Sequence, residues 1–255
     1  MLRHVPLLTA IRPLYDIPRD ASLRFPRYLT LLGSTPATII TPLNVMNPMA
    51  KPHITIYLDQ LIHADIDALA IGWIAEITAE LGDLGDYRHG FGVADDVAGG
   101  WTERSASEMR QRFAPPSQSW LTTLLFASDP LSIPYIRGLL RATCYRHYYK
   151  IQHGVPTTLG AMLRQEHAAL HFGDIAPTLP PDDLTYTDQI IRPYLAATDY
   201  PTQIAVLWGD DVARHNGFLP LGFSRDAGLA WACANNFHQS MDNFPNKKSH
   251  LPFTK

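Results

Sequence analysis

The sequence predicts an α/β or helix-rich α+β fold, with a small sheet and a helical half that contains an antiparallel helix hairpin. Short apolar segments typical of buried strands alternate with longer segments whose apolar residues recur at helical spacing. Asn-Gly turns between alternating strands are missing, which argues against a β-sandwich or a barrel. We expect one globular domain over residues 1–234 and a polar C-terminal tail over residues 235–255.

Four segments are predicted as strands because they are short, apolar and bounded by turn-forming residues: 38–45, 90–94, 120–127 and 204–208. Pro42 weakens the first of them, since proline cannot donate a ladder hydrogen bond. Ligands of open α/β sheets bind at the carboxyl ends of the strands. The turns after these segments are therefore candidates for a ligand site.

Apolar residues three and four positions apart predict the helices. Ser105 followed by Glu108 has the form of a capping box, which predicts a helix from Ser105 to about Phe113. The short loop 153–156 separates two long helical segments and makes them neighbours in space. The predicted helices are residues 53–81 with a break near 63–67, 105–113, 133–152, 157–172, 183 or 185 to 195, a short segment that ends at 216–217, and 227–234.

Composition and charge exclude several classes of protein. The net charge of −3 and the lack of a Lys/Arg tract give no electrostatic case for binding nucleic acid or an anionic membrane. No run approaches the roughly 18 apolar residues of a transmembrane helix, and Pro6 and Pro13 interrupt the N-terminus where a signal peptide would be apolar. Cys144 and Cys233 form no Cys-x-x-Cys motif and are interpreted as reduced thiols. We expect a cytoplasmic protein that binds a small molecule; its oligomeric state stays open.

Two ionisable residues fall within the apolar stripes of the hairpin helices: His147 in residues 133–152 and Glu166 in residues 157–172. An unpaired buried charge is costly, so each needs a partner, and in an antiparallel hairpin they can be each other's. A carboxylate that binds an imidazole raises its basicity, which suits general-base catalysis or metal binding. The alternative is a structural ion pair in which the partner of Glu166 is Arg137, Arg141 or Arg146.

His167 and His171 are four residues apart, a spacing that lets two imidazoles bind one metal ion from one helix face. Glu166 stands outside this pair, so the segment is not the His-Glu-x-x-His motif of zinc proteases. A third ligand would come from elsewhere, such as His153 or His147. A divalent metal ion is the candidate cofactor, and the alternative is a pair of partly exposed surface histidines.

Acids, glycines and a cation follow the predicted strand 90–94. Asp95 and Asp96 end this strand, and the turn after them leads into a helix, whose free N–H groups bind anions. A second strand-to-helix turn, residues 47–51, would face the first. The alternative for the first turn is an ordinary loop with an aspartate cap. The candidate ligand-binding residues of the two turns are Asn47, Lys51, Gly99, Gly100, Thr102 and Arg104.

Three segments carry a resemblance to a known family: 47–53 (NPMAKPH), 95–104 (DDVAGGWTER) and 153–159 (HGVPTTL), the last followed by Leu163, Gln165 and Glu166. They resemble an uncharacterised bacterial family with a Gly-Gly-Trp-Thr-Asn-Arg signature and a later Gln-Glu-Gly. The likeness spans residues 27–175 and implies no established activity. Ala50, Glu103 and His167 stand where the family has Gly, Asn and Gly. The resemblance therefore favours the carboxylates over the two-histidine site.

Together these residues predict a hydrolase-like enzyme for a small polar or anionic substrate. Glu166 and His147 would be the acid/base pair, and Asp95 and Asp96 would bind a divalent metal ion or polarise water. The segment 99–104 would hold the anionic group. One alternative is a ligand-binding protein without catalysis. Another is a structural or interaction domain, in which the His-Glu pair belongs to the core and the tail docks a partner.

Overall fold

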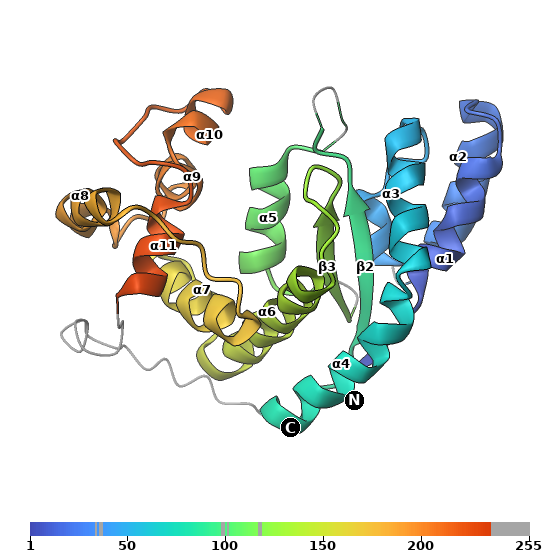
Figure 1. The fold of residues 1–255 in the computed structure, drawn as a ribbon, viewed down its shortest axis with the longest axis horizontal. Coiled ribbons are helices and arrows are strands. Elements are labelled where there is room, and N and C mark those ends of the chain that lie inside the picture. The colour runs from blue at the N-terminus through green and yellow to red at the C-terminus, as the bar shows by residue number, and fades with distance from the viewer. Residues whose placement is uncertain (34, 36–37, 98–99, 101, 117–118, 236–255) are drawn as a thin grey trace.

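The computed structural model describes residues 1–33, 35, 38–97, 100, 102–116 and 119–235. It is a helix-rich α/β fold around a three-stranded parallel sheet of order β1-β2-β3. The strands are β1 (Arg3–His4), β2 (Arg88–Ala94) and β3 (Trp120–Phe126), so the apolar β2 lies in the centre. In Figure 1 the sheet stands between the helices of the N-terminal part and helices α5–α7, with α8–α11 on the far side of α7.

Two of the four predicted strands are confirmed, and two predictions were wrong. Residues 90–94 lie in β2 and residues 120–126 in β3. Within segment 38–45, residues Thr41–Val45 form the 3-10 helix η2, which begins next to Pro42. Residues 204–208 end helix α9 (Tyr200–Trp208), where all five side chains are buried. A helix that is buried on every side has the same continuous apolar sequence as a buried strand, which explains the second error.

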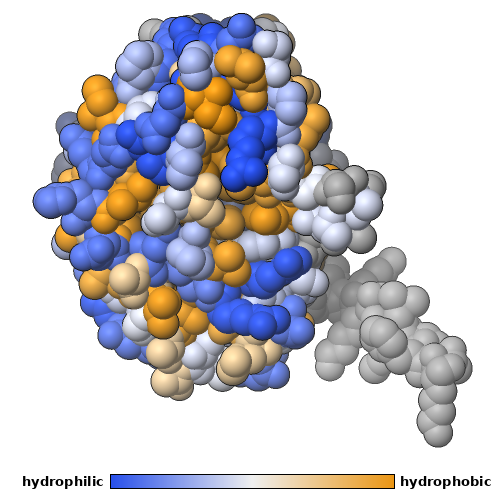
Figure 2. Space-filling model, turned by 90° about the vertical axis from the view of Figure 1, so that its right-hand side faces the viewer, coloured by the Kyte–Doolittle hydropathy of each residue, from blue (hydrophilic) through white to orange (hydrophobic). Residues whose placement is uncertain are grey.

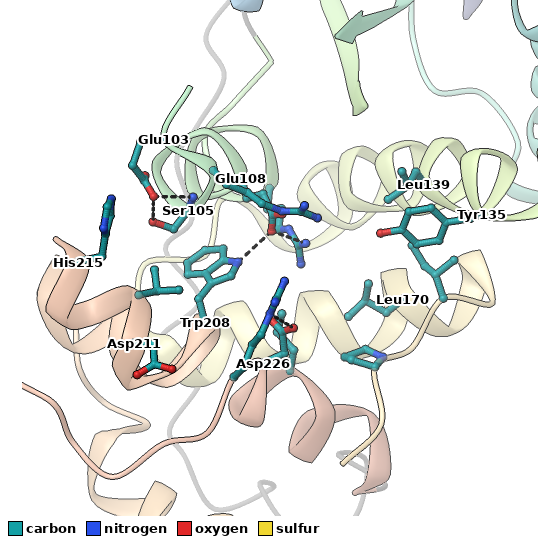
Figure 3. Close-up of a pocket in the computed structure, with 17 residues that line it drawn as sticks. Glu103, Ser105, Glu108, Tyr135, Leu139, Leu170, Trp208, Asp211, His215 and Asp226 are labelled. Atoms are coloured by element: carbon teal, nitrogen blue, oxygen red, sulfur yellow. Dashed lines mark hydrogen bonds and ion pairs between the residues drawn. The ribbon is translucent and has the colours of Figure 1, made fainter. Parts of the chain in front are cut away.

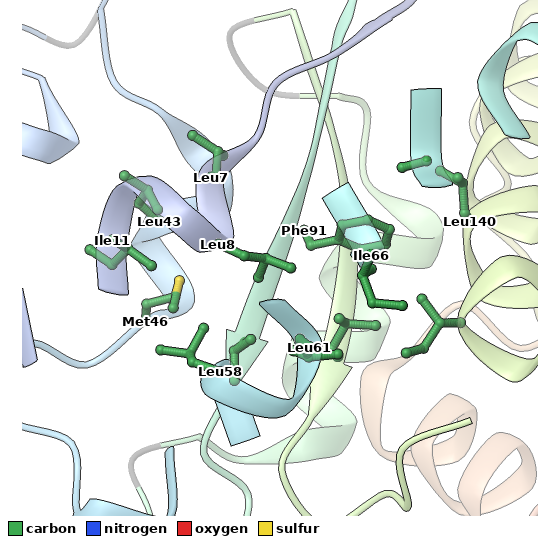
Figure 4. Packing of buried hydrophobic residues seen from close by; sticks show 14 of the residues in the cluster. Leu7, Leu8, Ile11, Leu43, Met46, Leu58, Leu61, Ile66, Phe91 and Leu140 are labelled. Atoms are coloured by element: carbon green, nitrogen blue, oxygen red, sulfur yellow. The ribbon is translucent and has the colours of Figure 1, made fainter. Parts of the chain in front are cut away.

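The N-terminal helices form the first hydrophobic core against the sheet. They are α1 (Leu7–Ile11), η1 (Arg12–Asp16), α2 (Ala21–Leu32), α3 (Pro52–His63) and α4 (Ile66–Leu81). The predicted break in residues 53–81 is confirmed, because Asp65 adopts a left-handed backbone with φ of 52° between α3 and α4. Phe91 of β2 lies among Leu8, Leu61 and Ile66 from these helices (Figure 4).

A row of hydrogen-bonded polar side chains crosses the sheet inside this core. Asp67 Oδ1 lies 2.8 Å from His4 Nε2, His4 Nδ1 lies 2.9 Å from His89 Nδ1, and His89 Nε2 lies 2.9 Å from Thr123 Oγ1. When both rings are neutral, the direction of the row is set by Asp67, because a carboxylate only accepts: Thr123 donates to His89, His89 to His4, and His4 to Asp67. We call Asp67, His4, His89 and Thr123 the sheet row.

Helices α5 (Arg104–Phe113), α6 (Ile133–His153) and α7 (Leu159–Gly173) connect the sheet to the C-terminal part. The contacts between α6 and α7 pair their residues in opposite order, since Arg141 bonds the carbonyl of Phe172 and Arg146 pairs with Glu166. At their closest approach the backbones touch, because a Cβ on Gly138 would lie 2.5 Å from the carbonyl oxygen of Gly173. Glycine at both positions permits this approach.

The C-terminal helices enclose a second hydrophobic core. They are α8 (Pro181–Ile191), η3 (Arg192–Tyr194), α9, α10 (Asp210–His215) and α11 (Ala227–Ala234). Helix α6 contributes Ile136 and Leu140 to the first core, whereas α7 contributes Leu159 and Leu163 to the second. Residues 236–255 of the predicted tail lie outside the described residues.

Within the described residues, no helix is long and apolar enough to span a membrane. The face that carries the N-terminal helices mixes hydrophilic and hydrophobic residues (Figure 2).

Candidate functional site

Helix α5 places three charged side chains on one face. Arg104, Glu108 and Arg112 are four residues apart, so they lie one above the other. Glu108 is buried, and its Oε1 accepts a 2.9 Å hydrogen bond from Arg104 Nε. Its Oε2 accepts from Arg112 at 2.6 Å and from Trp208 Nε1 at 2.9 Å. One carboxylate thus joins α5 to α9 in the C-terminal part.

The same charged row continues to Glu166 in the middle of α7. Glu166 is fully buried and accepts two hydrogen bonds from Arg146, at 2.7 and 2.8 Å, and one from Arg112 at 2.8 Å. Burial opposes its ionisation, but the charges of Arg146 and Arg112 outweigh burial and lower its pKa to about 2. We call Glu166, Arg146, Arg112, Glu108 and Arg104 the charge ladder.

The predicted pair of His147 and Glu166 was wrong. His147 Nε2 donates to the carbonyl of Leu84 at 2.9 Å, and its ring packs edge-on against Tyr87. Adjacent positions on α6 point about 100° apart, so Arg146 faces Glu166 and His147 faces the sheet side. Arg146, one of the three alternative partners, holds the carboxylate instead. Burial lowers the pKa of His147.

The structure separates the roles of Asp95 and Asp96 at the end of β2. Asp95 Oδ1 lies 2.8 Å from His53 Nε2, at the edge of the sheet where β2 and β3 end side by side. Asp96 accepts from the backbone N–H and the hydroxyl of Ser128, which follows β3, and from Arg104 at 3.3 Å. These bonds tie the ends of β2 and β3 together, so Asp96 closes the carboxyl edge of the sheet.

Arg104 is saturated by carboxylates. Besides Glu108 and Asp96, its guanidinium donates to both oxygens of Asp129 at 2.8 and 3.1 Å and stacks on Phe126. Its charge is therefore balanced inside the protein, which argues against its predicted role as the anion-holding group. The helix also begins differently from the prediction: Glu103, not Ser105, caps α5, and Glu108 belongs to the charge ladder.

The predicted glycine turn folds back on Asp95. The carbonyl of Asp95 accepts from Thr102 N at 2.8 Å, and a Cβ on Gly100 would lie 2.4 Å from that same oxygen. Gly99 lies outside the described residues. Asn47 caps its own turn by accepting from Met49 N, and Lys51 precedes α3 as its N-cap. The residues that line the large cavity, described below, do not include Asn47, Lys51, Gly100 or Thr102.

His167 and His171 form hydrogen bonds with backbone carbonyls, not the predicted metal site. His167 Nδ1 lies 2.8 Å from the carbonyl of Ala232, and His171 Nε2 lies 3.0 Å from that of Cys233. Both carbonyls belong to the last turn of α11, where the helix leaves acceptors without intrahelical partners. Among the described residues, no three His, Cys, Asp or Glu side chains gather as metal ligands do. The two histidines thus fasten α11 to α7.

A large cavity of about 390 Å³ lies where α5 and α6 meet the C-terminal helices. Figure 3 shows Glu108, Trp208 and Asp226 around one end of it and Tyr135, Leu139 and Leu170 around the other. Its polar wall also includes Arg104 and Arg112 of the charge ladder and Arg225. Cavities of this size, with an apolar wall and a few converging polar groups, are typical of small-molecule sites.

The pKa values of the two carboxyl groups at the polar end are shifted in opposite directions. Burial opposes ionisation of Glu108, but Arg112, Arg104 and the Trp208 hydrogen bond outweigh it and lower its pKa. Burial and the charge of Glu108 raise the pKa of Asp226. Asp226 precedes α11 with φ of 57°, yet its side chain makes no capping hydrogen bond. A carboxyl at an N-cap position normally caps, so this one is available to the cavity.

The candidate site therefore combines one predicted residue with several that the sequence analysis missed. Arg104 lines the cavity, whereas Glu166 joins it only through Arg112. The spacing of 104, 108 and 112 was a signal for one shared helix face, although such a face is usually solvated. Asp226 and Trp208 carried no local signal, since tertiary packing alone brings them to α5.

Comparisons with known proteins add no relative: no family model, no curated protein and no solved structure matches the chain. The resemblance to the Gly-Gly-Trp-Thr-Asn-Arg family stays a prediction.

Proposed function

We propose that the protein is a hydrolase-like enzyme whose active site is the 390 Å³ cavity, with Asp226 as the general acid. The observation that carries this proposal is the placement of Asp226 beside Glu108 at the polar end of the cavity. Two carboxyl groups whose environments push their pKa values apart are typical of acid/base sites. The group with the raised pKa is the one that can hold a proton for a leaving group.

Glu108 serves as a positioning residue in this proposal. Its two oxygens accept from Arg104, Arg112 and Trp208, which lower its pKa and make it a weak base. Its charge instead favours the protonated form of Asp226. Its hydrogen bonds also fix the indole of Trp208, which forms part of the cavity wall.

The balance of charge on the wall points to a small polar substrate with an apolar part. Arg104 and Arg112 are paired within the charge ladder, and Arg225 Nε lies 3.6 Å from Asp226. A bound anion would have to break these pairs, which is costly for buried charges. Leu139, Leu170 and Leu229 offer an apolar surface to the rest of the molecule.

The test is a panel of chromogenic esters, amides, glycosides and phosphate esters, assayed with the wild type and Asp226→Asn. We expect hydrolysis of one class, a loss of at least about 100-fold in kcat in the variant, and an activity that falls as rising pH deprotonates Asp226. Asp65→Asn is the matched control, because Asp65 also precedes a helix with a left-handed backbone and makes no capping hydrogen bond.

The stability of the Asp226→Asn variant distinguishes a catalytic role of Asp226 from a structural one. The raised pKa means that the folded protein holds the proton more tightly than the unfolded chain, so ionised Asp226 opposes folding at neutral pH. Asp226→Asn should therefore have an unchanged or higher Tm while losing activity. Equal activity of Asp226→Asn and wild type would overturn the proposal, and ligand binding without turnover would instead indicate a binding protein.

A further inference from the structure

A second, smaller cavity of about 90 Å³ lies at the opposite end of α5, where its last residues meet the start of β3 and the later half of α6. It shares no lining residue with the 390 Å³ cavity. Three cations line it, Arg110, Arg146 and Lys150, and its described lining residues include no Asp or Glu. The wall of this cavity is therefore positively charged, whereas the wall of the larger cavity carries both acidic and basic side chains.

Two buried polar atoms on residues of this wall have no partner among the described residues: Trp120 Nε1 and His147 Nδ1. Trp120 is 3% exposed and His147 4% exposed. Only Trp120 Nε1 of these two atoms is an N–H, because the neutral ring of His147 donates through Nε2. A buried N–H almost always has a hydrogen-bond partner, and leaving it unsatisfied is costly. The indole N–H can only donate, so the group that satisfies it must accept a hydrogen bond.

The cations of the wall are not equally available. Arg146 is paired with Glu166, whereas Lys150 Nζ donates to the neutral carbonyl of Ala114 at 2.6 Å. No carboxylate among the described residues forms an ion pair with Lys150, which is largely enclosed. Arg110 is exposed at the mouth of the cavity. An anionic acceptor here would meet the ammonium of Lys150, the guanidinium of Arg110 and the N–H of Trp120.

We propose that this cavity binds a small oxyanion of the size of phosphate, held by Lys150, Arg110 and the indole N–H of Trp120. A volume of about 90 Å³ has room for such an ion but not for a large ligand. The oxyanion satisfies the indole donor and supplies a counter-ion to the ammonium of Lys150. Burial and the charge of Arg146 lower the pKa of Lys150 to about 8, and a bound anion reverses this.

The proposal is tested by following the indole signals of the five tryptophans by NMR during titration with inorganic phosphate at constant ionic strength. Trp120→Phe keeps an aromatic ring, removes the N–H and identifies the Trp120 signal by its disappearance. We expect this signal to shift saturably with phosphate and not with chloride. A Trp120 signal that does not move with phosphate would overturn the proposal.

Two further measurements make the outcome independent of any one variant. Lys150→Met should weaken phosphate binding at least about tenfold, the range for a lost hydrogen bond to a charged group. Arg27→Met, which removes an exposed cation from α2, should leave it unchanged. In the wild type, the pKa of Lys150 should rise from about 8 when phosphate is added. Unchanged affinity in Lys150→Met, or an unchanged pKa in the wild type, would contradict the site.

Discussion

The sheet row and the charge ladder are two clusters of buried polar side chains, and they hold their protons in different ways. In the sheet row His89 is held neutral, because burial first and then the neighbouring His4 lower its pKa well below the ordinary value of 6.5. The charge ladder is fully ionised, and each carboxylate is matched by arginines. The large cavity lies against the ladder, so a wall of fixed charges, rather than the neutral row, shapes the candidate site.

The largest loss of stability should appear when one member of the charge ladder loses its charge. Arg112→Met removes a partner of both Glu108 and Glu166, and breaking a buried ion pair costs about 3–5 kcal/mol in the free energy of unfolding. Urea denaturation measures it. Arg192→Met, which breaks the exposed pair with Asp188, is the control and should cost less than about 1 kcal/mol. Similar losses in both variants would contradict the buried ladder.

Acid should destabilise the two regions in separate pH ranges. The native state holds His89 neutral, so the unfolded chain binds more protons, and stability falls as pH drops below about 6.5, by up to about 1.4 kcal/mol per pH unit. Glu166 has a lowered pKa, so its contribution is complete above its ordinary value of 4.5 and is lost only as pH falls toward 2.

Unfolding free energies measured from pH 7 to pH 3 should therefore decline in two steps. His147 adds to the first step, because its pKa is lowered as well. His89→Gln should reduce the slope of the first step and leave the second in place. A single decline confined to the range below pH 4.5 would show that the sheet row does not titrate as its geometry implies.

The smallest of these effects should come from the end of the sheet row. Thr123→Val keeps the shape of the side chain and leaves His89 Nε2 without its hydrogen-bond partner, at a cost of about 1–3 kcal/mol. Thr123→Ser retains the hydroxyl and should cost less. Thr30→Val, at an exposed helical hydroxyl, is the control. A valine variant as stable as the wild type would remove Thr123 from the row.

Periodicity made much of the fold predictable, but it could not distinguish a solvated charged face from a buried one. The break at Asp65, strands β2 and β3, and the two long helices α6 and α7 all follow from local apolar spacing. Strand β1 has only two residues, too few to leave a pattern.

The site was less predictable because its key contacts are tertiary. Glu166 was correctly predicted to need a partner, and Arg146 was among the alternatives, but Arg112 reaches it from a helix 54 positions earlier. Trp208 lies 100 positions from the Glu108 that it bonds. Neither distance is encoded in local spacing, and Asp226 becomes a candidate only when the fold brings it to the cavity that α5 also lines.

The contact between Gly138 and Gly173 has a mechanical consequence. Where two helices touch through side chains, rotamer changes let them slide, but here backbone meets backbone and no such adjustment is available. We therefore expect α6 and α7 to keep a fixed position relative to each other between the two cores. If the large cavity widens to admit a substrate, we expect the movement in α9, α10 and the segment before α11 rather than between α6 and α7.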